Sequence, residues 1–515
     1  MHENPEILIQ RVKRTLEERL VPAIYSPISP LRVSAWRVPR EGEVIGEPVS
    51  FSDIPDTFPE FAVGQSWGSA WETTWFKFQG TVPAVDSLSC REGDVVEARL
   101  DLGWSDVSAG FQAEGLVRDI AGNAIKAVNP RNQWVPLPVA KHVSQDFQFY
   151  VEAAANPLLL DIPPFQPTDE GDKLTASTQD IYTLHAADVV IRHGDIYDFV
   201  LDVSILLELV QSAAQLTHRE LEILFGISSA LDCLDFQRLC DTVPLAQKRL
   251  QPLLDRPALP REHELFAVGH AHIDSAWLWP LRETRRKVAR TLANVVRLLE
   301  DGHEMVFALP AAQHVAWLEQ DEPQLFERVK ALVAKGKIVP VGGMWVEPDA
   351  VLPGGEALAR QLVEGLNYFT EKFDVSCQEI WLPDSFGYTA ALPQLARCAG
   401  ISRFLTQKIS WNQTNIFPHH TLWWEGIDGS RVFTHFPPAD TYGSDVTGAQ
   451  LRHAVENFKE AGRANSSMLL YGYGDGGGGP TREMLERLAR VRNLEGFAKT
   501  CLLYTSDAAD ERSSV

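Results

Sequence analysis

Short apolar segments alternate with amphipathic helical patterns through residues 261–500, and this alternation restricts the folds open to the chain. The first apolar segment, 265–269, is followed by a helical pattern from about 282 to 300. The later apolar segments lie at 305–309, 338–341, 380–382, 404–406 and 468–473. Strands that alternate with helices indicate a mostly parallel sheet. We therefore expect an α/β domain at 261–500, with a sheet that is open or closed into a β/α-barrel-like form.

The preceding residues show other periodicities. Residues 1–25 are expected to begin with a helix, because Asn4 can cap it and apolar side chains recur every fourth position at Leu8, Val12, Leu16 and Leu20. In the segment 26–203, apolar and charged residues alternate, most clearly at 96–102, which predicts a β-sandwich-like domain. Residues 204–260 return to helical spacing and end in a proline-containing linker, so we expect a helical connector there.

The composition excludes several classes of function. The 515 residues include 47 Lys and Arg against 69 Asp and Glu, and the formal net charge of −22 disfavours binding to nucleic acid or to an anionic membrane. No run of about 18 apolar residues is present, so no membrane span is expected. The six cysteines include no C-x-x-C pair, which argues against a zinc ribbon. We expect reduced thiols and a cytoplasmic location.

Polar side chains collect at the carboxyl ends of the predicted strands. His270, His272 and Asp274 follow the first strand, and Asp384 and Asp475 follow two later strands. Other polar residues at strand ends are Trp345, Glu347, Asp349, Gln407 and Lys408. In parallel sheets and barrels, active sites form at this edge. One shared site explains so many polar strand ends better than separate solvated loops do.

Several of these residues suit metal-binding or catalytic chemistry. His272 and Asp274 are two positions apart and point the same way on an extended segment, which suits zinc; a hydrogen-bonded loop is the alternative. Asp384 follows a buried strand that could hold a nucleophile or a metal ligand rigidly, although turns also use aspartate. Asp475 precedes four glycines, and a general acid fits this loop better than a phosphate site, since the carboxylate would repel phosphate.

Several long strings, in this order along the chain, resemble glycoside hydrolase family 38, the class II α-mannosidases. They are HAHIDSAWLWP, GGMWVEPDAVLPGGEALARQ, WLPDSFGYTAALPQ, TQKISWNQTNIFPHHTLWWEGIDGS, HFPPADTY and YGYGDGGGGP. The cytosolic and bacterial branch is the most similar, and GFQAEGLVRDIAGNAIKAVNPRNQ resembles its N-terminal β domain. The resemblance covers essentially residues 1–500. It implies retaining, metal-dependent hydrolysis of terminal α-mannosides in oligosaccharides, and it leaves homo-oligomerisation of the full-length protein open.

The resemblance also implies roles for individual residues. His272, Asp274 and Asp384 would hold a divalent cation, either zinc or cobalt, and Asp384 would also be the nucleophile. Asp475 would be the general acid/base, with Asp445 as one reserve. The substrate-binding residues would be Trp277, Lys408 and Asp440, of which Asp440 is the second reserve for the general acid/base.

The sequence departs from the family pattern in one respect. The family's fourth metal ligand is a histidine in a string like LELHRGTYT, which does not occur here, and the helical bundle and large C-terminal β domains of full-length members are also missing. Residues 501–515 resemble a translated sequencing adapter, so we expect a non-native tail on a truncated chain. The alternative functions are a catalytically inactive fragment or weak sugar-binding module and, in third place, a metal-dependent deacetylase.

Overall fold

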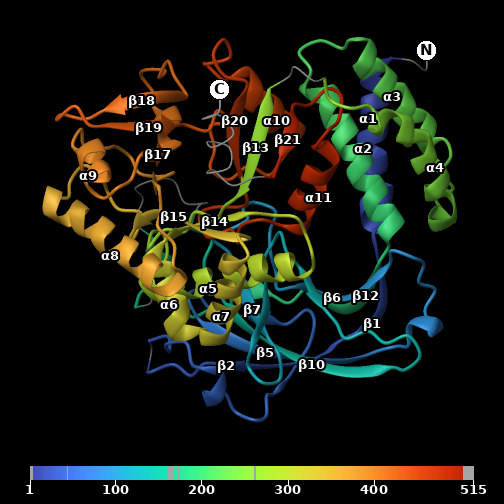
Figure 1. The fold of residues 1–515 in the computed structure, drawn as a ribbon. Coiled ribbons are helices and arrows are strands. Elements are labelled where there is room, and N and C mark those ends of the chain that lie inside the picture. The colour runs from blue at the N-terminus through green and yellow to red at the C-terminus, as the bar shows by residue number, and fades with distance from the viewer. Residues whose placement is uncertain (1–3, 43, 160–167, 172–173, 260–262, 503–515) are drawn as a thin grey trace. The chain divides into compact units, whose positions relative to one another are not determined.

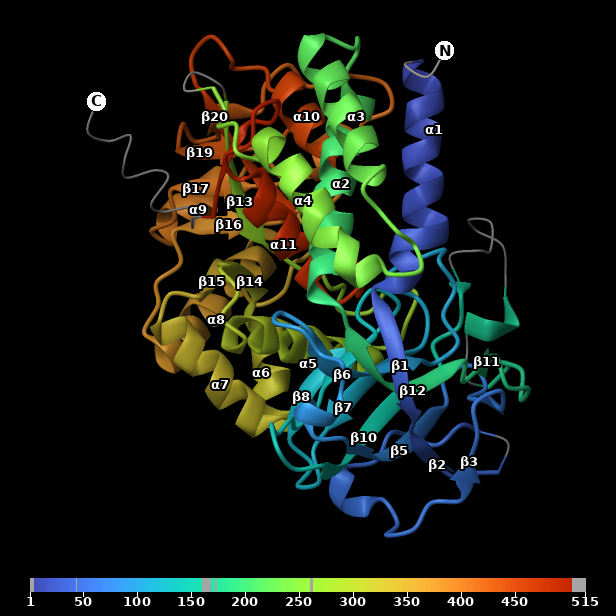
Figure 2. The same ribbon diagram turned by 90° about the vertical axis from the view of Figure 1, so that its right-hand side faces the viewer.

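The computed structural model describes residues 4–42, 44–159, 168–171, 174–259 and 263–502 (Figures 1 and 2). The contacts divide the chain into an N-terminal unit, Met1–Pro257, and a C-terminal unit, Ala258–Val515. The division falls close to the predicted linker, of which residues 260–262 lie outside the described part. The expected non-native tail lies outside the described part from residue 503 onward.

Four helices belong to the N-terminal unit. In α1 (Pro5–Thr15), the Asn4 side chain accepts hydrogen bonds from the backbone N–H groups of Glu6 and Ile7, as the sequence predicted. The helix continues through η1 (Leu16–Leu20) and η2 (Val21–Ala23), and its leucine and valine stripe is buried. α2 (Gly194–Ser212), α3 (His218–Leu231) and α4 (Leu239–Leu254) pack against one another, and α1 packs against α3.

Two larger antiparallel sheets and one two-stranded sheet lie in the described residues of this unit. In order across the first sheet lie β1 (Tyr25–Pro30), β12 (Ala186–Arg192), β6 (Val95–Asp101) and β9 (Trp134–Pro136). In order across the second lie β3 (Glu60–Phe61), β2 (Arg32–Arg37), β5 (Thr73–Val82), β10 (Gln145–Ala154), β7 (Glu114–Arg118) and β8 (Ala124–Val128). β4 (Ser66–Trp67) pairs with β11 (Tyr182–Thr183). One apolar core takes Ala98 and Leu100 from the first sheet and Phe76 and Phe78 from the second, which confirms the predicted sandwich.

The C-terminal unit contains two further sheets. The first has the parallel order β15 (Ile338–Met344), β14 (Phe307–Ala311), β13 (Glu264–Gly269) and β20 (Ser466–Tyr471), and β21 (Lys499–Cys501) also pairs with β13. The second has the order β16 (Glu379–Trp381), β17 (Arg403–Leu405), β19 (Arg431–His435) and β18 (Thr421–Glu425). Only β18 among these runs antiparallel, joined to β19 through the predicted Asp428-Gly429 turn. The mostly parallel α/β prediction is confirmed.

Helices connect most of these strands. They are α5 (Leu281–Glu300), α6 (Ala312–Asp321), α7 (Pro323–Ala334), α8 (Gly355–Phe373), α9 (Leu392–Cys398), α10 (Gly448–Glu456) and α11 (Arg482–Val491). The hydrogen-bonded ladder does not continue from β15 to β16 among the described strands, although the two strands are in contact, and closure into a barrel stays a prediction. Gly342 and Gly343 of β15 take positive φ angles of 86° and 62°, and a Cβ at Gly342 would lie 3.3 Å from the Cβ of Trp381, so the strand passes close to β16 there.

A buried apolar cluster connects the two sheets beneath the strand ends. It includes Val268 of β13, Val341 of β15, Trp381 of β16 and Leu470 of β20. Because these side chains are close-packed, the carboxyl ends of strands far apart in the sequence are held in fixed positions relative to one another. The cluster therefore supplies the rigid base on which the polar strand ends stand.

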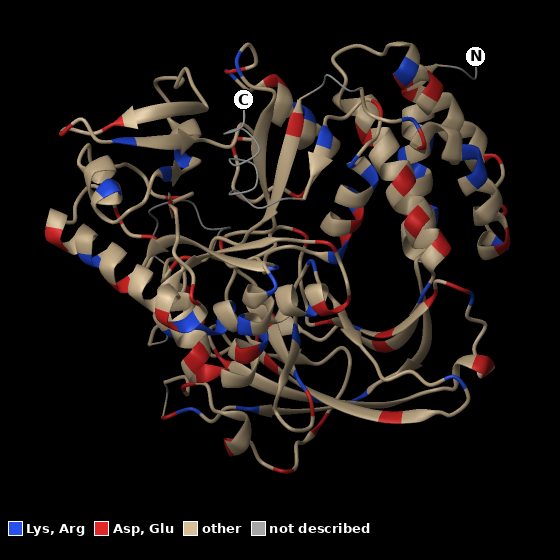
Figure 3. Cartoon of the chain, viewed as in Figure 1, with Lys and Arg blue, Asp and Glu red and all other residues tan. Residues whose placement is uncertain are grey.

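Two further expectations from the sequence concern the excess of acidic residues and the absence of membrane spans. Figure 3 shows acidic residues on helices, strands and loops of both units rather than on one segment. Within the described residues, none of the helices is both long and apolar enough to cross a membrane.

A buried ion-pair network on α5 yields a stability prediction. Glu283 is 2% exposed, and its carboxylate accepts hydrogen bonds from Arg290 and Arg286. Burial alone would raise the pKa of Glu283, but the nearby arginines prevail and lower it from 4.5 to about 2. The ionised carboxylate therefore stabilises the fold fully above about pH 4.5, and this contribution is lost as pH falls toward about 2.

We expect Glu283→Gln to lower the free energy of unfolding at pH 7 by about 3–5 kcal/mol, because it leaves buried arginine charges uncompensated. The difference from the wild type should shrink as the pH is lowered below about 4.5 in denaturant titrations. The matched control is Glu300→Gln, which removes an exposed pair with Arg328 and should cost less than about 1 kcal/mol. A pH-independent difference for Glu283→Gln would contradict the assignment.

Candidate active site

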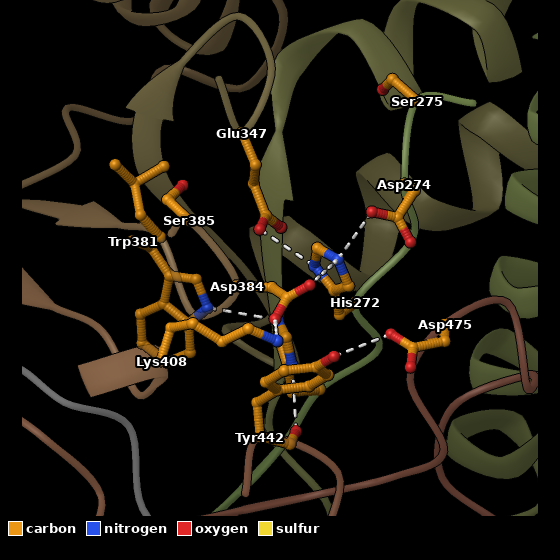
Figure 4. Close-up of polar contacts among 12 residues, drawn as sticks. His272, Asp274, Ser275, Glu347, Trp381, Asp384, Ser385, Lys408, Tyr442 and Asp475 are labelled. Carbon is orange, nitrogen blue, oxygen red and sulfur yellow. Dashed lines mark hydrogen bonds and ion pairs between the residues drawn. The ribbon is translucent and has the colours of Figure 1, made fainter. Parts of the chain in front are cut away.

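Five of the seven predicted site residues meet at the carboxyl edge of the parallel strands (Figure 4). His272 and Asp274 follow β13, Asp384 follows β16, Lys408 opens η7 (Lys408–Trp411) after β17, and Asp475 follows β20. Figure 4 shows their charged groups turned toward one another. The expectation that polar strand ends meet at one edge is therefore met.

His272 lies at the centre of this group. Its Nε2 atom is 3.2 Å from Asp274 Oδ1 and 3.6 Å from Asp384 Oδ2, and its Nδ1 atom is 3.0 Å from Glu347 Oε2. Both ring nitrogens of a buried imidazole thus face carboxylates. The Tyr442 ring packs beside the imidazole with a centroid separation of 5.1 Å. The ring orientation of His272 is fixed from two sides.

The close approach of several acids changes the protonation of the site. Burial alone would lower the pKa of His272, but the negative charges of Glu347 and Asp274 raise it well above the usual value. Burial raises the pKa of Glu347. His314, which hydrogen-bonds Ser275, has its pKa lowered to about 4 by burial and by the charge of His272. Positive charge is therefore strongly favoured at His272, and the neighbouring His314 stays neutral.

The segment that carries Asp274 is fastened to α5 through Thr284. The Thr284 hydroxyl donates to the carbonyl oxygen of Asp274 at 3.2 Å, and it accepts from the Ala276 N–H at 2.9 Å and the Trp279 indole N–H at 3.0 Å. Ala276 has a φ of 76°, a left-handed conformation that is strained for alanine. One threonine thus holds a sharply turned backbone beside the acidic cluster.

Asp384 and Lys408 form a buried ion pair. Lys408 Nζ contacts Asp384 Oδ1, and the ammonium also lies 3.5 Å from the Trp411 ring centroid and 4.4 Å from that of Phe386. Aromatic faces attract a cation through their quadrupole, so both rings help to hold the lysine beside the carboxylate. The structure gives Lys408 a direct partner in Asp384, and its predicted role in binding substrate stays a prediction.

Asp475 projects toward the same site from the loop after β20. Its Oδ1 atom accepts a hydrogen bond from the Tyr442 hydroxyl at 2.8 Å. Burial raises the pKa of Asp475, which favours a carboxyl group that can keep a proton. Burial and the charge of Asp475 raise the pKa of Tyr442, so its hydroxyl stays a donor. A Cβ at Gly474 would lie 2.9 Å from the Tyr442 ring, so the missing side chain makes room for this contact.

Three of these residues form a possible cation site. One ligand atom from each of His272, Asp384 and Asp475 lies within 4.8 Å of the others. Asp274 adjoins the group through His272, and its buried Oδ2 atom has no hydrogen-bond partner among the described residues. An imidazole nitrogen with carboxylate oxygens is a donor set that zinc and similar divalent ions accept. The residues present fit a divalent cation.

The other two predicted residues are placed differently. Trp277 is 51% exposed, and its ring lies in an edge-on contact with Trp279. Asp440 accepts hydrogen bonds at Oδ2 from Asn457 and pairs with His453 Nε2 at 2.8 Å. Their predicted roles in substrate binding stay predictions.

The sequence patterns missed two members of the site. Tyr442 lies in a loop without periodicity, and although it ends the HFPPADTY string, no role was predicted for it. Glu347 was one of the polar strand-end residues, but nothing in its sequence context indicated His272 as its partner. Such contacts join loops far apart along the chain, so spacing alone does not reveal them.

Family comparisons agree with this arrangement. The model of the glycosyl hydrolases family 38 N-terminal domain matches residues 262–508, and that of the alpha-mannosidase jelly roll domain matches residues 29–190. The chain belongs to glycosyl hydrolase family 38. The family 38 match contains every residue of the His272 group, and the jelly roll match covers most of the antiparallel strands of the N-terminal unit.

Curated family 38 relatives are similar over most of this chain. Human alpha-mannosidase 2C1 is 36% identical over 85% of the chain and 41% of its own length. Alpha-mannosidase G of Dictyostelium discoideum is 31% identical over 97% of the chain and 45% of its own length. An alpha-mannosidase of Saccharomyces cerevisiae is 33% identical over 91% and 42%, respectively. The chain thus spans less than half the length of each of these relatives.

The geometry predicts how substitutions change the affinity for Zn²⁺. We expect His272→Ala and Asp384→Ala to abolish stoichiometric zinc binding, because each removes a donor from the central group. Glu347→Gln should weaken it by about 10–100-fold, because the negative charge beside the second ring nitrogen is lost. Competition with a chromogenic chelator measures all three.

Asp349→Asn is the matched control for zinc binding, because the Asp349 carboxylate only accepts hydrogen bonds from the backbone of Val351 and Leu352. Its zinc affinity should equal that of the wild type. Unchanged zinc affinity in His272→Ala would contradict a cation site at this position.

Proposed function

We propose that this chain carries the catalytic site of a retaining, metal-dependent α-mannosidase that hydrolyses terminal α-mannosides in oligosaccharides. The observation that carries the proposal is the approach of Asp384 and Asp475, whose nearest carboxylate oxygens lie within 4.8 Å of one another. Retaining glycosidases place their two carboxyl groups about 5–5.5 Å apart, whereas inverting enzymes leave a wider gap for water. Membership of family 38 and the mannosidase relatives supply the substrate class.

Asp384 is the proposed nucleophile. Lys408 binds its Oδ1 atom, and Oδ2 faces His272. Asp384 attacks the anomeric carbon and forms a glycosyl ester while the bond to the leaving-group oxygen breaks. A rigid carboxylate suits this step, because strand β16 and the ion pair hold it in one orientation.

Asp475 is the proposed general acid/base. In the first step it protonates the leaving-group oxygen, and in the second it takes a proton from the water that hydrolyses the ester. The Tyr442 hydroxyl occupies Oδ1, so Oδ2 remains for the transferred proton. The raised pKa of Asp475 supports the protonated form that the first step needs.

His272, Asp274 and Asp384 are the proposed ligands of a divalent cation, zinc or cobalt. Such an ion supplies positive charge that polarises hydroxyl oxygens of a bound sugar. Glu347 orients the His272 ring through its Nδ1 atom. The half-exposed Trp277 is the proposed aromatic contact for the apolar face of a pyranose ring. Lys408 and Asp440 remain the proposed binders of substrate hydroxyls.

We also propose a cytoplasmic location. The six cysteines, all of which lie in the described part of the chain, form no disulfide, as expected in a reducing compartment. No nucleic-acid or membrane partner is proposed, because the net charge of −22 opposes both. Homo-oligomerisation of a full-length protein stays open.

The function is tested with an aryl α-mannoside and the zinc-loaded protein. We expect release of mannose with retained α-configuration by proton NMR, loss of turnover with chelator, and recovery with added Zn²⁺. Asp384→Ala should lose more than about 10³-fold in kcat, because the nucleophile is removed. Unchanged turnover in this variant would exclude Asp384 as the nucleophile. Mannose binding without turnover would support a sugar-binding module instead, and acetate release from an acetylated sugar would support a deacetylase.

A separate test addresses Asp475. Asp475→Asn should lower kcat/KM by about 10²–10⁴-fold for a mannoside with a poor leaving group, because protonation of that group is lost. With 2,4-dinitrophenyl α-mannoside the loss should be far smaller, because this leaving group needs no proton. Equal losses on both substrates would argue against a general acid at position 475.

A further inference from the structure

His270 is a fully buried polar residue that has no place in the proposed mechanism. It follows β13 and precedes His272 by two residues, yet it is not among the three residues of the possible cation group. Its backbone N–H donates to the carbonyl oxygen of Tyr471 at 2.8 Å, which continues the pairing of β13 with β20. Its position in the fold is therefore fixed by the sheet.

The two ring nitrogens of His270 have different partners. The indole N–H of Trp381, which can only donate, points at Nε2 from 3.2 Å. Nε2 must then be the unprotonated nitrogen, so the neutral ring carries its proton on Nδ1. Nδ1 lies 3.4 Å from the carbonyl oxygen of Tyr442, which can only accept. Both hydrogen bonds are satisfied by one neutral tautomer.

These two contacts join the segments that carry the two catalytic carboxylates. Trp381 is the last residue of β16, three positions before Asp384. Tyr442 holds Asp475 through its side-chain hydroxyl, and the same residue's backbone carbonyl receives the His270 hydrogen bond. Figure 4 shows Trp381, Tyr442 and both aspartates around the common site.

We propose that His270 is a positioning residue that sets the relative placement of Asp384 and Asp475. The inference rests on the proposed retaining mechanism, in which both carboxylates act on one anomeric centre. A neutral imidazole is suited to this task because it connects two backbone segments without adding charge to a crowded ionic site. A displacement of about 1 Å in such a site can cost 10²-fold in rate.

The test uses Trp381→Phe, which removes only the indole donor and keeps an aromatic ring in the core. Without the indole donor, His270 should lose its hydrogen bond to the Tyr442 carbonyl oxygen. The Tyr442 side chain should then no longer hold Asp475 in position. We expect kcat/KM for α-1,6-mannobiose to fall by about 10–100-fold. With 2,4-dinitrophenyl α-mannoside, kcat/KM should stay within about threefold, because acid catalysis is not needed. Zinc affinity should equal that of the wild type.

Further variants separate positioning from general loss of structure. Trp424→Phe makes the same change elsewhere in this unit and should leave the ratio of the two kcat/KM values unchanged. Tyr442→Phe should reproduce the leaving-group selectivity, and adding Trp381→Phe to it should have little further effect. His270→Asn, which keeps a donor near Tyr442, should retain more mannobiose activity than His270→Leu.

Three results would overturn the proposal. They are equal losses on both substrates for Trp381→Phe, a parallel loss of zinc affinity, and additive effects in the Trp381→Phe/Tyr442→Phe variant.

A fourth readout does not depend on turnover. In ¹⁵N-histidine-labelled protein, the His270 signal, identified by its absence in His270→Asn, should show protonated Nδ1; protonated Nε2 would exclude the network. A wild-type protein that hydrolyses neither mannoside would contradict the proposed function, while the tautomer would still decide the network.

Discussion

The chemistry of the C-terminal unit depends on burying one imidazole among several carboxylates. Around His272, the side chains of Asp274, Glu347 and Asp384 approach from three strand ends, and like charges so close repel strongly in a medium of low dielectric constant. Positive charge must offset that repulsion, from the imidazolium, from Lys408 or from a bound cation. A divalent cation at the proposed site would compete with the proton for the same imidazole nitrogen, so its binding would release that proton.

The periodicity of apolar residues predicts most of the architecture, because an element that is buried on one face needs apolar residues at regular intervals. The alternation at 96–102 and the succession of strands and helices after 261 each arise because one face of the element is buried. Both patterns predicted the elements that the structure contains. The meeting of the strand ends followed from parallel geometry alone. Closure of the sheet into a barrel depends on contacts between strands far apart in the sequence, so periodicity alone does not predict it.

The partners within the site were not readable in the same way. Residue types marked His272, Asp384 and Asp475, whereas no spacing rule connects Tyr442 to Asp475 or Trp381 to His270. Those hydrogen bonds depend on loop conformations that the apolar cluster beneath the strands makes possible. Asp440 illustrates the converse: its chemistry suits a sugar hydroxyl, but its carboxylate is turned to His453 and Asn457. Family resemblance supplied the substrate class, which neither periodicity nor charge contains.

The pairing of β13 has a consequence for how the protein is made. Leu265 in this strand pairs with Ser467 of β20 and with Thr500 of β21, although β13 begins the unit and both partner strands come much later in the sequence. During synthesis, β13 lacks these partner strands until almost the whole unit has emerged from the ribosome. Such long-range parallel pairing closes slowly and leaves an apolar strand edge open in the meantime. Protection of that edge in the nascent chain is then a condition for reaching the assembled site.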